Sequence, residues 1–571
     1  MAIITMNLPE NKKHGRGLFP AAYFAATAML LLPSYSHGQA QGQMGQGQMG
    51  QGQMGQGQMG QGQPGQGRLG MAGNMSPQSA EGGWRIRPRM SVLETYTDNV
   101  TFARDDLKKG DFITQINPGL AITGVGRRFN FTGEYMMNNL IYADQSSFTR
   151  TRHQLNANAT AELIENLLFV DARALMTQQN ITLTGPQAIN NVNVTGNRAD
   201  VRNFSISPYI RHRFQDFATT ELRYTRNVTS SSANALRNSQ ADGFQAGLTS
   251  GTAFTAFNWG LNYSNQTIHF DGSNRPVELE RSIASLGYRI TPQFGLTATG
   301  GYERNSFISI RGNPSSPTWT VGFSWMPSER TSIVASAGQR FFGPTYSLMA
   351  SHRTRLTVWD ASYTQNITTF NQQAGLGSAG MFGGSLNQLL AAQNPSLSPE
   401  FIQQNSNALA GLGLSGSFFS PTNFLTNQVF LQKTLQASVA MNGLRNTAVF
   451  RVFDMTRQAY TQDSADVGLI GADNQALLNH TRQSGINALW SYRISELTRA
   501  NLNLGFTRFS FLSTTRVDDL KLISLSLTRQ LPQVRPNLST MLQIRHNQRD
   551  SNQPGGEYRE NAIIASLNMT F

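Results

Sequence analysis

Apolar and polar residues alternate along most of the chain from Trp84 onward. Residues 155–163 place leucine or alanine at every second position, with asparagine, threonine and glutamate between them. Residues 257–264 and 318–326 alternate large apolar side chains with glycine, serine, threonine and asparagine. A period of two indicates β-strands with one apolar and one polar face. The alternation continues for about nine to twelve residues, the length of a tilted membrane strand rather than of a shorter soluble strand.

Short breaks in the alternation divide this region into strands. Outer-membrane barrels have short turns on the periplasmic side and keep both termini there, so ten such turns predict an all-β, transmembrane, antiparallel up-and-down barrel of about 22 strands (range 18–22). The turns are expected at Gly124–Arg128, Glu165-Asn166, Gln215-Asp216, Gly251–Phe254, Thr291–Gln293, Pro327–Arg330, Arg353–Arg355, Gly443–Asn446, Glu496–Arg499 and Gln533–Pro536.

Longer breaks predict the external loops. The longest, 366–428, is rich in glycine, asparagine and glutamine, and Leu386–Gln404 could form one or two short helices. A barrel this wide leaks unless its lumen is constricted. Two interpretations stay open: the 366–428 loop folds into the lumen, or it lies above the barrel mouth. The expected external loops are 178–200, 229–240, 304–316, 366–428 and 456–482.

Aromatic residues and the C-terminus fit a membrane barrel. The last residues alternate, and Leu567, Met569 and the terminal Phe571 share the apolar face. A final strand ending in phenylalanine resembles the signal that the outer-membrane assembly machinery recognises, although Met569 stands where an aromatic is common. Aromatics near predicted strand ends suit the girdles at the membrane interfaces; they are Tyr135, Tyr142, Tyr209, Tyr224, Tyr288, Tyr302, Trp359, Tyr363, Trp490 and Tyr492.

The N-terminal region has a different composition. A basic stretch containing Lys12, Lys13 and Arg16 precedes a short apolar stretch and small residues, which predicts a signal peptide over 1–38. Within residues 39–83, the segment 39–68 consists of Gly-Gln-Met repeats, with methionine at every fifth position from 44 to 59. Such a segment has no apolar face to pack, so we expect a disordered periplasmic linker. The predicted barrel is 84–571.

The amino-acid composition excludes several classes of protein and of chemistry. Hydrophobic residues make up 39% of the chain, and the sequence lacks the long apolar runs of a helical membrane protein. Charged residues are 14%, which is low for a soluble domain. The chain has no cysteine, which removes disulfides, thiol catalysis and cysteine-bound metals.

The net charge is +13, and arginine supplies 40 of the 46 basic residues. The arginines are scattered, without the basic stripe or motif of a nucleic-acid binder. They either hold together polar networks in the lumen or make the lumen attractive to anionic polymers. Strand parity predicts that four arginines face the lumen, namely Arg211, Arg213, Arg289 and Arg340. Arg508 instead shares parity with Leu504 and Phe506, which predicts a position at the membrane interface.

Four segments resemble a known family: Glu94–Val100, Ala161–Ala174, Ser205–Ala218 and Ser351–Ala361. They are similar to the PEP-CTERM system-associated outer-membrane β-barrel family of bacteria that have an exosortase and make exopolysaccharide. The resemblance covers about 84–571 and implies a porin-like barrel in exopolysaccharide export or surface assembly. The Gly-Gln-Met repeat lies outside the family pattern.

No motif indicates catalysis. The chain contains no His-Glu-x-x-His, P-loop or Gly-x-Ser-x-Gly sequence in a supporting context, so we expect no enzyme, cofactor or metal site. The function we expect is exopolysaccharide export in the outer membrane. The alternatives are a closed barrel that retains partners through its external loops and a generic diffusion porin. The expected partners are outer-membrane lipid, the barrel assembly machinery and anionic exopolysaccharide.

Overall fold

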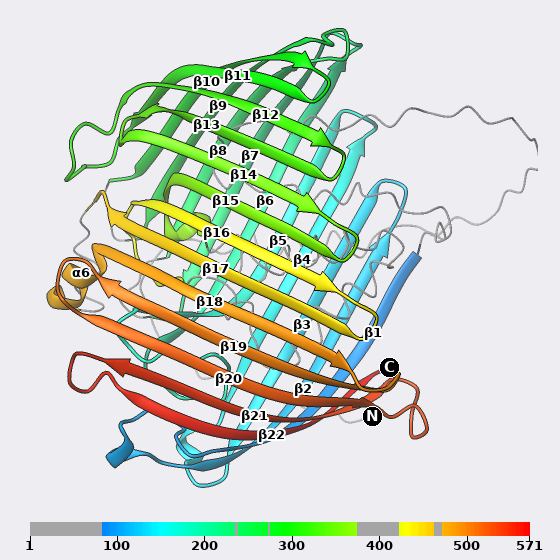
Figure 1. Ribbon diagram of the computed structural model, residues 1–571, viewed down its shortest axis with the longest axis vertical. Helices are drawn as coiled ribbons and strands as arrows, with labels where there is room; N and C mark the ends of the chain where they lie inside the picture. The colour runs from blue at the N-terminus through cyan, green and yellow to red at the C-terminus, as the bar shows by residue number, and fades with distance from the viewer. Residues whose placement is uncertain (1–82, 234–237, 272–274, 374–421, 462–470) are drawn as a thin grey trace, which may run out of the picture. The chain divides into compact units, whose positions relative to one another are not determined.

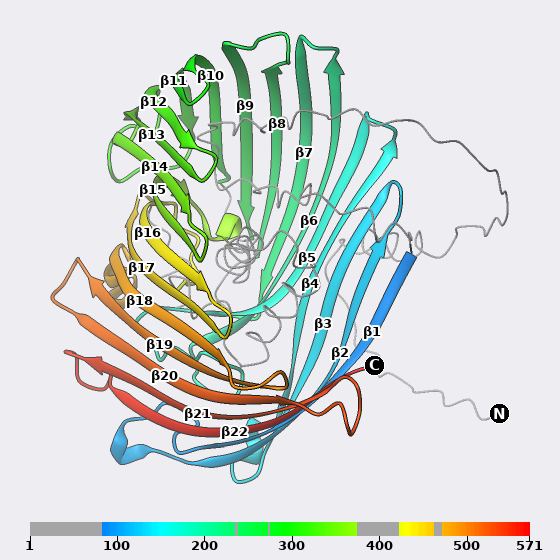
Figure 2. The same ribbon diagram turned by 45° about the vertical axis from the view of Figure 1, so that its right-hand side comes forward.

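The computed structural model describes residues 83–233, 238–271, 275–373, 422–461 and 471–571. The predicted signal peptide and nearly all of the predicted linker lie outside this range. Twenty-two strands form one antiparallel sheet in which each strand pairs with the next, and β1 also pairs with β22 (Figures 1 and 2). The sheet is therefore a closed barrel, and the predicted number of strands is confirmed.

The strands are β1 (Gly83–Thr97), β2 (Asp111–Val125), β3 (Phe129–Tyr142), β4 (Arg150–Ile164), β5 (Leu168–Asn180), β6 (Arg198–Phe214), β7 (Ala218–Ser231), β8 (Ser239–Ser250), β9 (Phe257–Phe270), β10 (Val277–Thr291), β11 (Phe294–Asn305), β12 (Ser316–Ser328), β13 (Thr331–Arg340), β14 (Gly343–Arg353), β15 (Thr357–Thr368), β16 (Phe430–Asn442), β17 (Asn446–Ala459), β18 (His480–Arg493), β19 (Thr498–Phe511), β20 (Val517–Gln530), β21 (Leu538–Ser551) and β22 (Tyr558–Thr570). The described helices are η2 (Asp105–Leu107), η3 (Ser146–Phe148) and α6 (Ala472–Leu478).

The connections differ at the two ends of the barrel. All ten predicted short turns join an even-numbered strand to the following odd-numbered strand. The start of β1 and the end of β22 lie at this same end, which we call the short-turn end. Asn166 and Gln215 occupy two of these turns with φ of 56° and 47°, and asparagine tolerates this left-handed conformation well. The opposite, long-loop end carries every loop predicted to be external.

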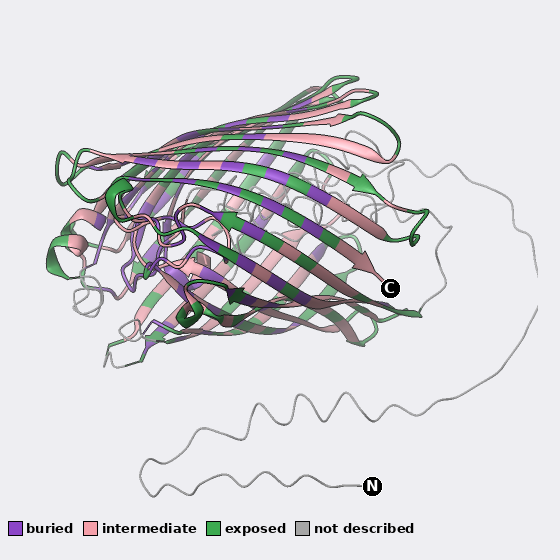
Figure 3. Cartoon of the chain, turned by 90° about the horizontal axis from the view of Figure 1, so that it is seen from below, coloured by how far each residue is buried: buried purple, intermediate pink, exposed green. Residues whose placement is uncertain are grey.

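Polarity is inverted relative to a soluble protein. Large apolar side chains such as Trp319, Leu525 and Ile544 point outward and are about half exposed, at 52%, 52% and 56%. Asn487 and Gln543 point inward and are buried, at 1% and 2%. Buried and exposed positions alternate along the strands (Figure 3). This pattern is that of a barrel with lipid outside and a polar lumen.

Aromatic residues gather on the outward face near the short-turn end. Trp84 packs on Phe129 with ring centroids 5.6 Å apart, and Trp490 stacks on Tyr492 at 5.9 Å. The prediction of an interfacial position is wrong for two of these aromatic residues. Tyr142 and Tyr209 are buried, at 2% and 7%, because their strand parity turns them inward, where arginines cover them.

The C-terminal strand completes the barrel. Leu567 lies opposite Val92 and Met569 opposite Met90 in the β1–β22 register. Phe571 follows the strand and donates its backbone N–H to the carbonyl of Pro88 at 2.9 Å. The predicted assembly signal therefore lies at the seam between the first and last strands. In the described part of the chain, no helix has the length and apolarity needed to cross a membrane.

Adjacent residues of β9 test the inverted polarity. Leu261 points outward and is 52% exposed, whereas its neighbour Asn262 points into the lumen. Leu261→Arg should lower the free energy of unfolding in lipid vesicles by about 2–4 kcal/mol, because a charge on the lipid face must leave water. Asn262→Arg is the matched control and should change it by less than about 1 kcal/mol. Equal losses in urea titrations of both variants would contradict the assigned faces.

Candidate functional site

The four predicted lumen arginines all lie on inward positions, but on three strands that the barrel does not bring together. Arg211 of β6 binds Glu221 through Nε and Nη2 at 3.1 and 2.6 Å. Arg340 of β13 is buried and donates to Glu303 at 2.7 Å and Asn366 at 3.2 Å. Arg213 and Arg289 lie near the short-turn end, where both are exposed. They form no common site.

Arg508 behaves as its parity indicates. Its side chain is on the outward face of β19 and makes a two-pronged ion pair with Asp519, with both N–O distances 2.8 Å. These five arginines therefore lie on the faces that strand parity predicts, whereas the function of the inward ones stays a prediction.

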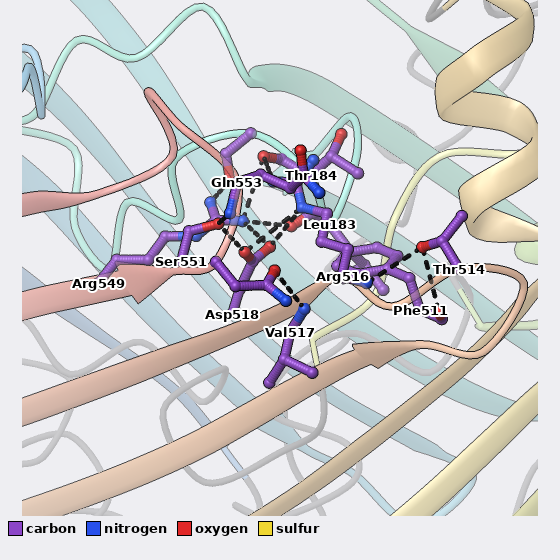
Figure 4. A network of polar contacts seen from close by, with 12 residues as sticks. Leu183, Thr184, Phe511, Thr514, Arg516, Val517, Asp518, Arg549, Ser551 and Gln553 are labelled. Atoms are coloured by element: carbon purple, nitrogen blue, oxygen red, sulfur yellow. Dashed lines mark hydrogen bonds and ion pairs between the residues drawn. The ribbon is translucent and has the colours of Figure 1, made fainter.

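The 181–197 loop, which connects β5 to β6, folds inward across the long-loop mouth. Figure 4 shows Leu183 and Thr184 of this loop beside β20 and β21, where they lie close to Arg549. Arg549 donates to the carbonyls of Leu183 and Thr184 at 3.2 and 3.1 Å and also to that of Gly185. The backbone carbonyls of three consecutive residues thus accept hydrogen bonds from one guanidinium group. These bonds hold this part of the loop without using its side chains.

Asp518 balances the charge of Arg549. The two side chains lie 2.6 Å apart and are 0% and 1% exposed. Arg516 adds a second guanidinium, which donates to the Thr184 carbonyl at 3.0 Å and forms an ion pair with Asp518 at 3.1 Å. Burial lowers the pKa of Arg516 from its ordinary value. We call Arg549, Arg516 and Asp518 the first clamp.

The same loop is tied to the wall at a second point. Asn193 donates its amide to Glu560 at 3.0 Å, and Glu560 is held by Arg545 at 2.6 Å. The backbone N–H of Val194 donates to the Val100 carbonyl at 2.8 Å, which links this loop to the β1–β2 connection. The loop is therefore held at both its beginning and its end.

The two flanks of the largest loop, 369–373 and 422–429, also lie inside the mouth. Asn371 donates to Thr229 and Ser239 at 3.1 and 3.0 Å, and both hydroxyls point into the lumen. On the other flank, the backbone N–H of Thr422 donates to the inward Gln483 at 2.8 Å. The flanks thus fold into the barrel. Residues 374–421, which include the predicted short helices, lie outside the described residues.

Arg457 of β17 joins the two flanks and forms the second clamp. It is buried and donates to the side-chain oxygens of Gln373 at 2.9 Å and Asn423 at 3.0 Å, one from each flank. A third bond goes to Gln432 of β16 at 2.9 Å. Amide oxygens alone therefore receive these three bonds, so the charge is stabilised by dipoles that belong largely to the loop it holds.

The two loops meet across the mouth. Phe424 forms a parallel bridge with Asn180, and the N–H of Leu425 donates to the Asn180 carbonyl at 3.2 Å. Asn180 ends β5, whereas Phe424 precedes β16, and these strands lie half a circuit apart in a barrel of 22 strands. Leu183 and Phe424 pack in one buried apolar cluster. A continuous strap of described chain therefore spans the long-loop mouth.

The residues of the two clamps were not predicted from the sequence. One signal was available: Gln543, Arg545, Asn547 and Arg549 alternate along β21 and share its inward face. Such an inward polar run predicts lumen-facing side chains. It does not predict which loop they hold, because the partners of Arg549 are backbone carbonyls more than 360 residues away.

The fold and its inverted polarity define a large outer-membrane-type β-barrel. Neither a protein-family model nor a curated protein sequence matches the chain. Similar solved structures include the siderophore receptor PirA from Pseudomonas aeruginosa (12% identity, 85% of this chain and 80% of that chain, TM-score 0.41). Others are the FrpB iron transporter from Neisseria meningitidis, F5-1 variant (10%, 86% and 83%, 0.48), and the ferric-catecholate import receptor Fiu from E. coli K12 (10%, 85% and 82%, 0.43).

The first clamp makes a testable prediction. Asp518→Ala should lower the free energy of unfolding by about 3–5 kcal/mol, because it leaves the Arg549 charge buried without its carboxylate. The double variant Asp518→Ala/Arg549→Met removes both charges and should recover much of this loss. Denaturant titration measures both. A single variant as stable as the parent would show that the ion pair is not desolvated as described.

Proposed function

We propose that this chain is an outer-membrane conduit, closed at rest by its own loops, that takes part in the export or surface assembly of exopolysaccharide. The observation that carries the conduit is the strap across a closed barrel with a polar lumen, held by the two arginine clamps. The polysaccharide role is supported by the resemblance of four sequence segments to PEP-CTERM-associated barrels. The excess of arginine adds support.

The proposed orientation places the short-turn end in the periplasm. Outer-membrane barrels have short periplasmic turns and long external loops, and both ends of this barrel's chain lie at the short-turn end. The strap is then at the cell surface. A polymer that moves outward would reach the strap last, after passing through the lumen.

Hydrogen bonds and apolar contacts together hold the strap. The clamps contribute guanidinium bonds to carbonyl and amide oxygens, each worth about 1.5–3 kcal/mol. The strap also contributes buried apolar side chains, with Leu183 and Phe424 in one cluster and Leu425 in another. Such a strap can open without unfolding the barrel, because the strand pairing does not depend on it.

A closed barrel that retains partners at the surface is the second candidate, and the strap across the mouth also favours it. Ion conductance separates the two functions. A conduit opens when its strap is released, whereas a retention protein with a permanently filled lumen does not.

Purified protein in planar bilayers tests the gate. Arg457→Ala/Arg549→Ala should increase the time spent in a conducting state at least about tenfold, because each lost charged hydrogen bond removes more than about 1.4 kcal/mol from the closed state. Arg508→Ala is the control, because its ion pair with Asp519 lies on the outward face. If the clamp variant is folded but shows no ion conductance, the proposed conduit function is wrong and surface retention is favoured.

A deletion strain tests the polysaccharide role. Secreted polysaccharide should fall and periplasmic polymer should accumulate when the protein is absent, because polymer made in the cell then lacks its exit. Complementation with the parent gene should restore both pools. If neither pool changes in the deletion strain, exopolysaccharide export is not the function.

A further inference from the structure

Three arginines meet beneath the loop between β5 and β6, close to the start of β6. Arg150 of β4 donates to the backbone carbonyls of Asn191 and Asn193 at 3.3 and 3.4 Å. Arg198, the first residue of β6, donates to the backbone carbonyl of Asn190. Because neighbouring loop residues accept these bonds, the guanidinium groups of Arg150 and Arg198 lie close together.

Arg152 joins this group through a carboxylate. It follows Arg150 by two residues on the inward face of β4, and its Nη1 atom lies 2.8 Å from Asp200 of β6. Asp200 in turn follows Arg198 by two residues on one face of its strand. The charges of the three arginines and of Asp200 act on one another. We call Arg150, Arg152 and Arg198 the arginine triad.

The triad lies where two strands of the wall separate. The register of the β4–β5 pair begins with Leu155 opposite Met176, so the described residues of β4 before Leu155 have no ladder partner on β5. Arg152 reaches across this break in the ladder to Asp200, which is 46% exposed, whereas the Arg152 side chain is only 12% exposed. Solvent therefore reaches the triad from the side of Asp200.

The triad carries more positive charge than the described chain around it balances. Asp200 is the described carboxylate that acts on both Arg150 and Arg198. Asp111 lies near Tyr142, but its carboxylate accepts two backbone N–H groups at 3.0 and 2.9 Å. Three guanidinium groups against one carboxylate leave an excess of two positive charges. Such charges repel one another strongly where burial reduces screening by water.

Four hydrogen-bond donors at the triad have no acceptor within the described residues. They are the Nε atoms of the three arginines and the side-chain amide nitrogen of Asn138, and all are buried. Asn138 is 5% exposed and lies directly opposite Arg152 in the β3–β4 register. Buried donors normally have a partner. Water would satisfy these donors but would leave the charge unbalanced, whereas an anion does both.

Charge and shape favour a tetrahedral dianion as that partner. A phosphate group carries about −1.5 to −2 charges at neutral pH, which cancels most or all of the excess on the triad. Guanidinium groups bind phosphate and carboxylate oxygens through short, charge-assisted hydrogen bonds. A carboxylate offers two oxygens and one charge, so it matches the triad less well than phosphate or sulfate does.

We propose that the arginine triad and Asn138 bind a phosphate or sulfate group, which helps to hold the strap in place. The site goes beyond the conduit proposed above and does not depend on it. Arg150 and Arg198 also hold the loop, so an anion that removes their repulsion stabilises its attachment to the wall. Three sources offer this chemistry: free phosphate or sulfate, the phosphate of a lipid headgroup, and a phosphate or sulfate substituent of a polysaccharide.

Equilibrium dialysis of the full chain in neutral detergent against radiolabelled phosphate tests the site. One phosphate should bind per barrel, and sulfate should displace it, whereas chloride and acetate at equal ionic strength should not. Arg150→Gln/Arg198→Gln should weaken binding at least about tenfold, because charge-assisted hydrogen bonds are lost. Arg211→Gln is the matched control and should bind as the parent does, because Arg211 faces the lumen on the same strand as Arg198 but is paired with Glu221.

Asp200→Asn separates the effect of charge from an effect on folding. Removing the carboxylate increases the positive excess, so phosphate should bind at least about threefold more tightly. A change that only loosened the loop would weaken binding instead. Absence of phosphate and sulfate binding to the parent, weaker binding to Asp200→Asn, or an equal loss in Arg211→Gln and the triad variant each overturns the site.

Hydrogen exchange and competition define the role of the anion and its source. Phosphate should slow backbone hydrogen exchange at residues 190–194 at least about threefold, because bound anion stabilises the attached loop. Unchanged exchange overturns the link to the strap. Displacement of labelled phosphate by vesicles containing phosphatidic acid supports a lipid headgroup, displacement by dextran sulfate supports a polymer substituent, and displacement by neither supports free phosphate. These measurements do not require ion flow, so their failure is distinct from failure of the conduit.

Discussion

Closure of the sheet is the constraint on which the rest of this structure depends. A strand in lipid has no water to satisfy its backbone N–H and C=O groups, so no edge can remain open. Here β1 pairs with both β2 and β22, and the backbone of Phe571 reaches Pro88 to extend the seam. Once the sheet is closed, one face of every strand meets lipid and the other meets the lumen. The outward Leu525 and the inward Ser524 are consequences of that single requirement.

Closing 22 strands creates a second problem, because side chains from the wall cannot fill so wide a lumen. In this chain, loops obstruct the lumen at one end. There the 181–197 loop and the flanks of the 369–429 loop cross the mouth and meet at Asn180 and Phe424. Arginine suits this role because one guanidinium can donate several hydrogen bonds at once. Arg549 uses them on backbone carbonyls and Arg457 on amide side chains, so neither clamp requires a specific partner charge in the loop.

The interpretation that arginines hold together polar networks in the lumen is confirmed near the strap, whereas attraction of anionic polymers stays a prediction. Near the strap, burial makes an unpaired charge costly, and the arginines there have carboxylate, carbonyl or amide partners. Near the short-turn end, Arg493 lies opposite Arg499 in the β18–β19 register and donates to the Leu444 carbonyl.

The sequence by itself determined the barrel, because strand alternation and turn chemistry are local. Positions such as Asn166 and Gln215 marked turns without knowledge of any distant partner, and parity placed Arg340 inward and Arg508 outward. Parity also corrects the interfacial assignment of Tyr142 and Tyr209, which had rested on their nearness to strand ends. Only the tertiary structure decided how the mouth is closed. The strap depends on contacts such as Arg549 with Leu183, between residues far apart in sequence, and a carbonyl acceptor leaves no mark in the side-chain pattern.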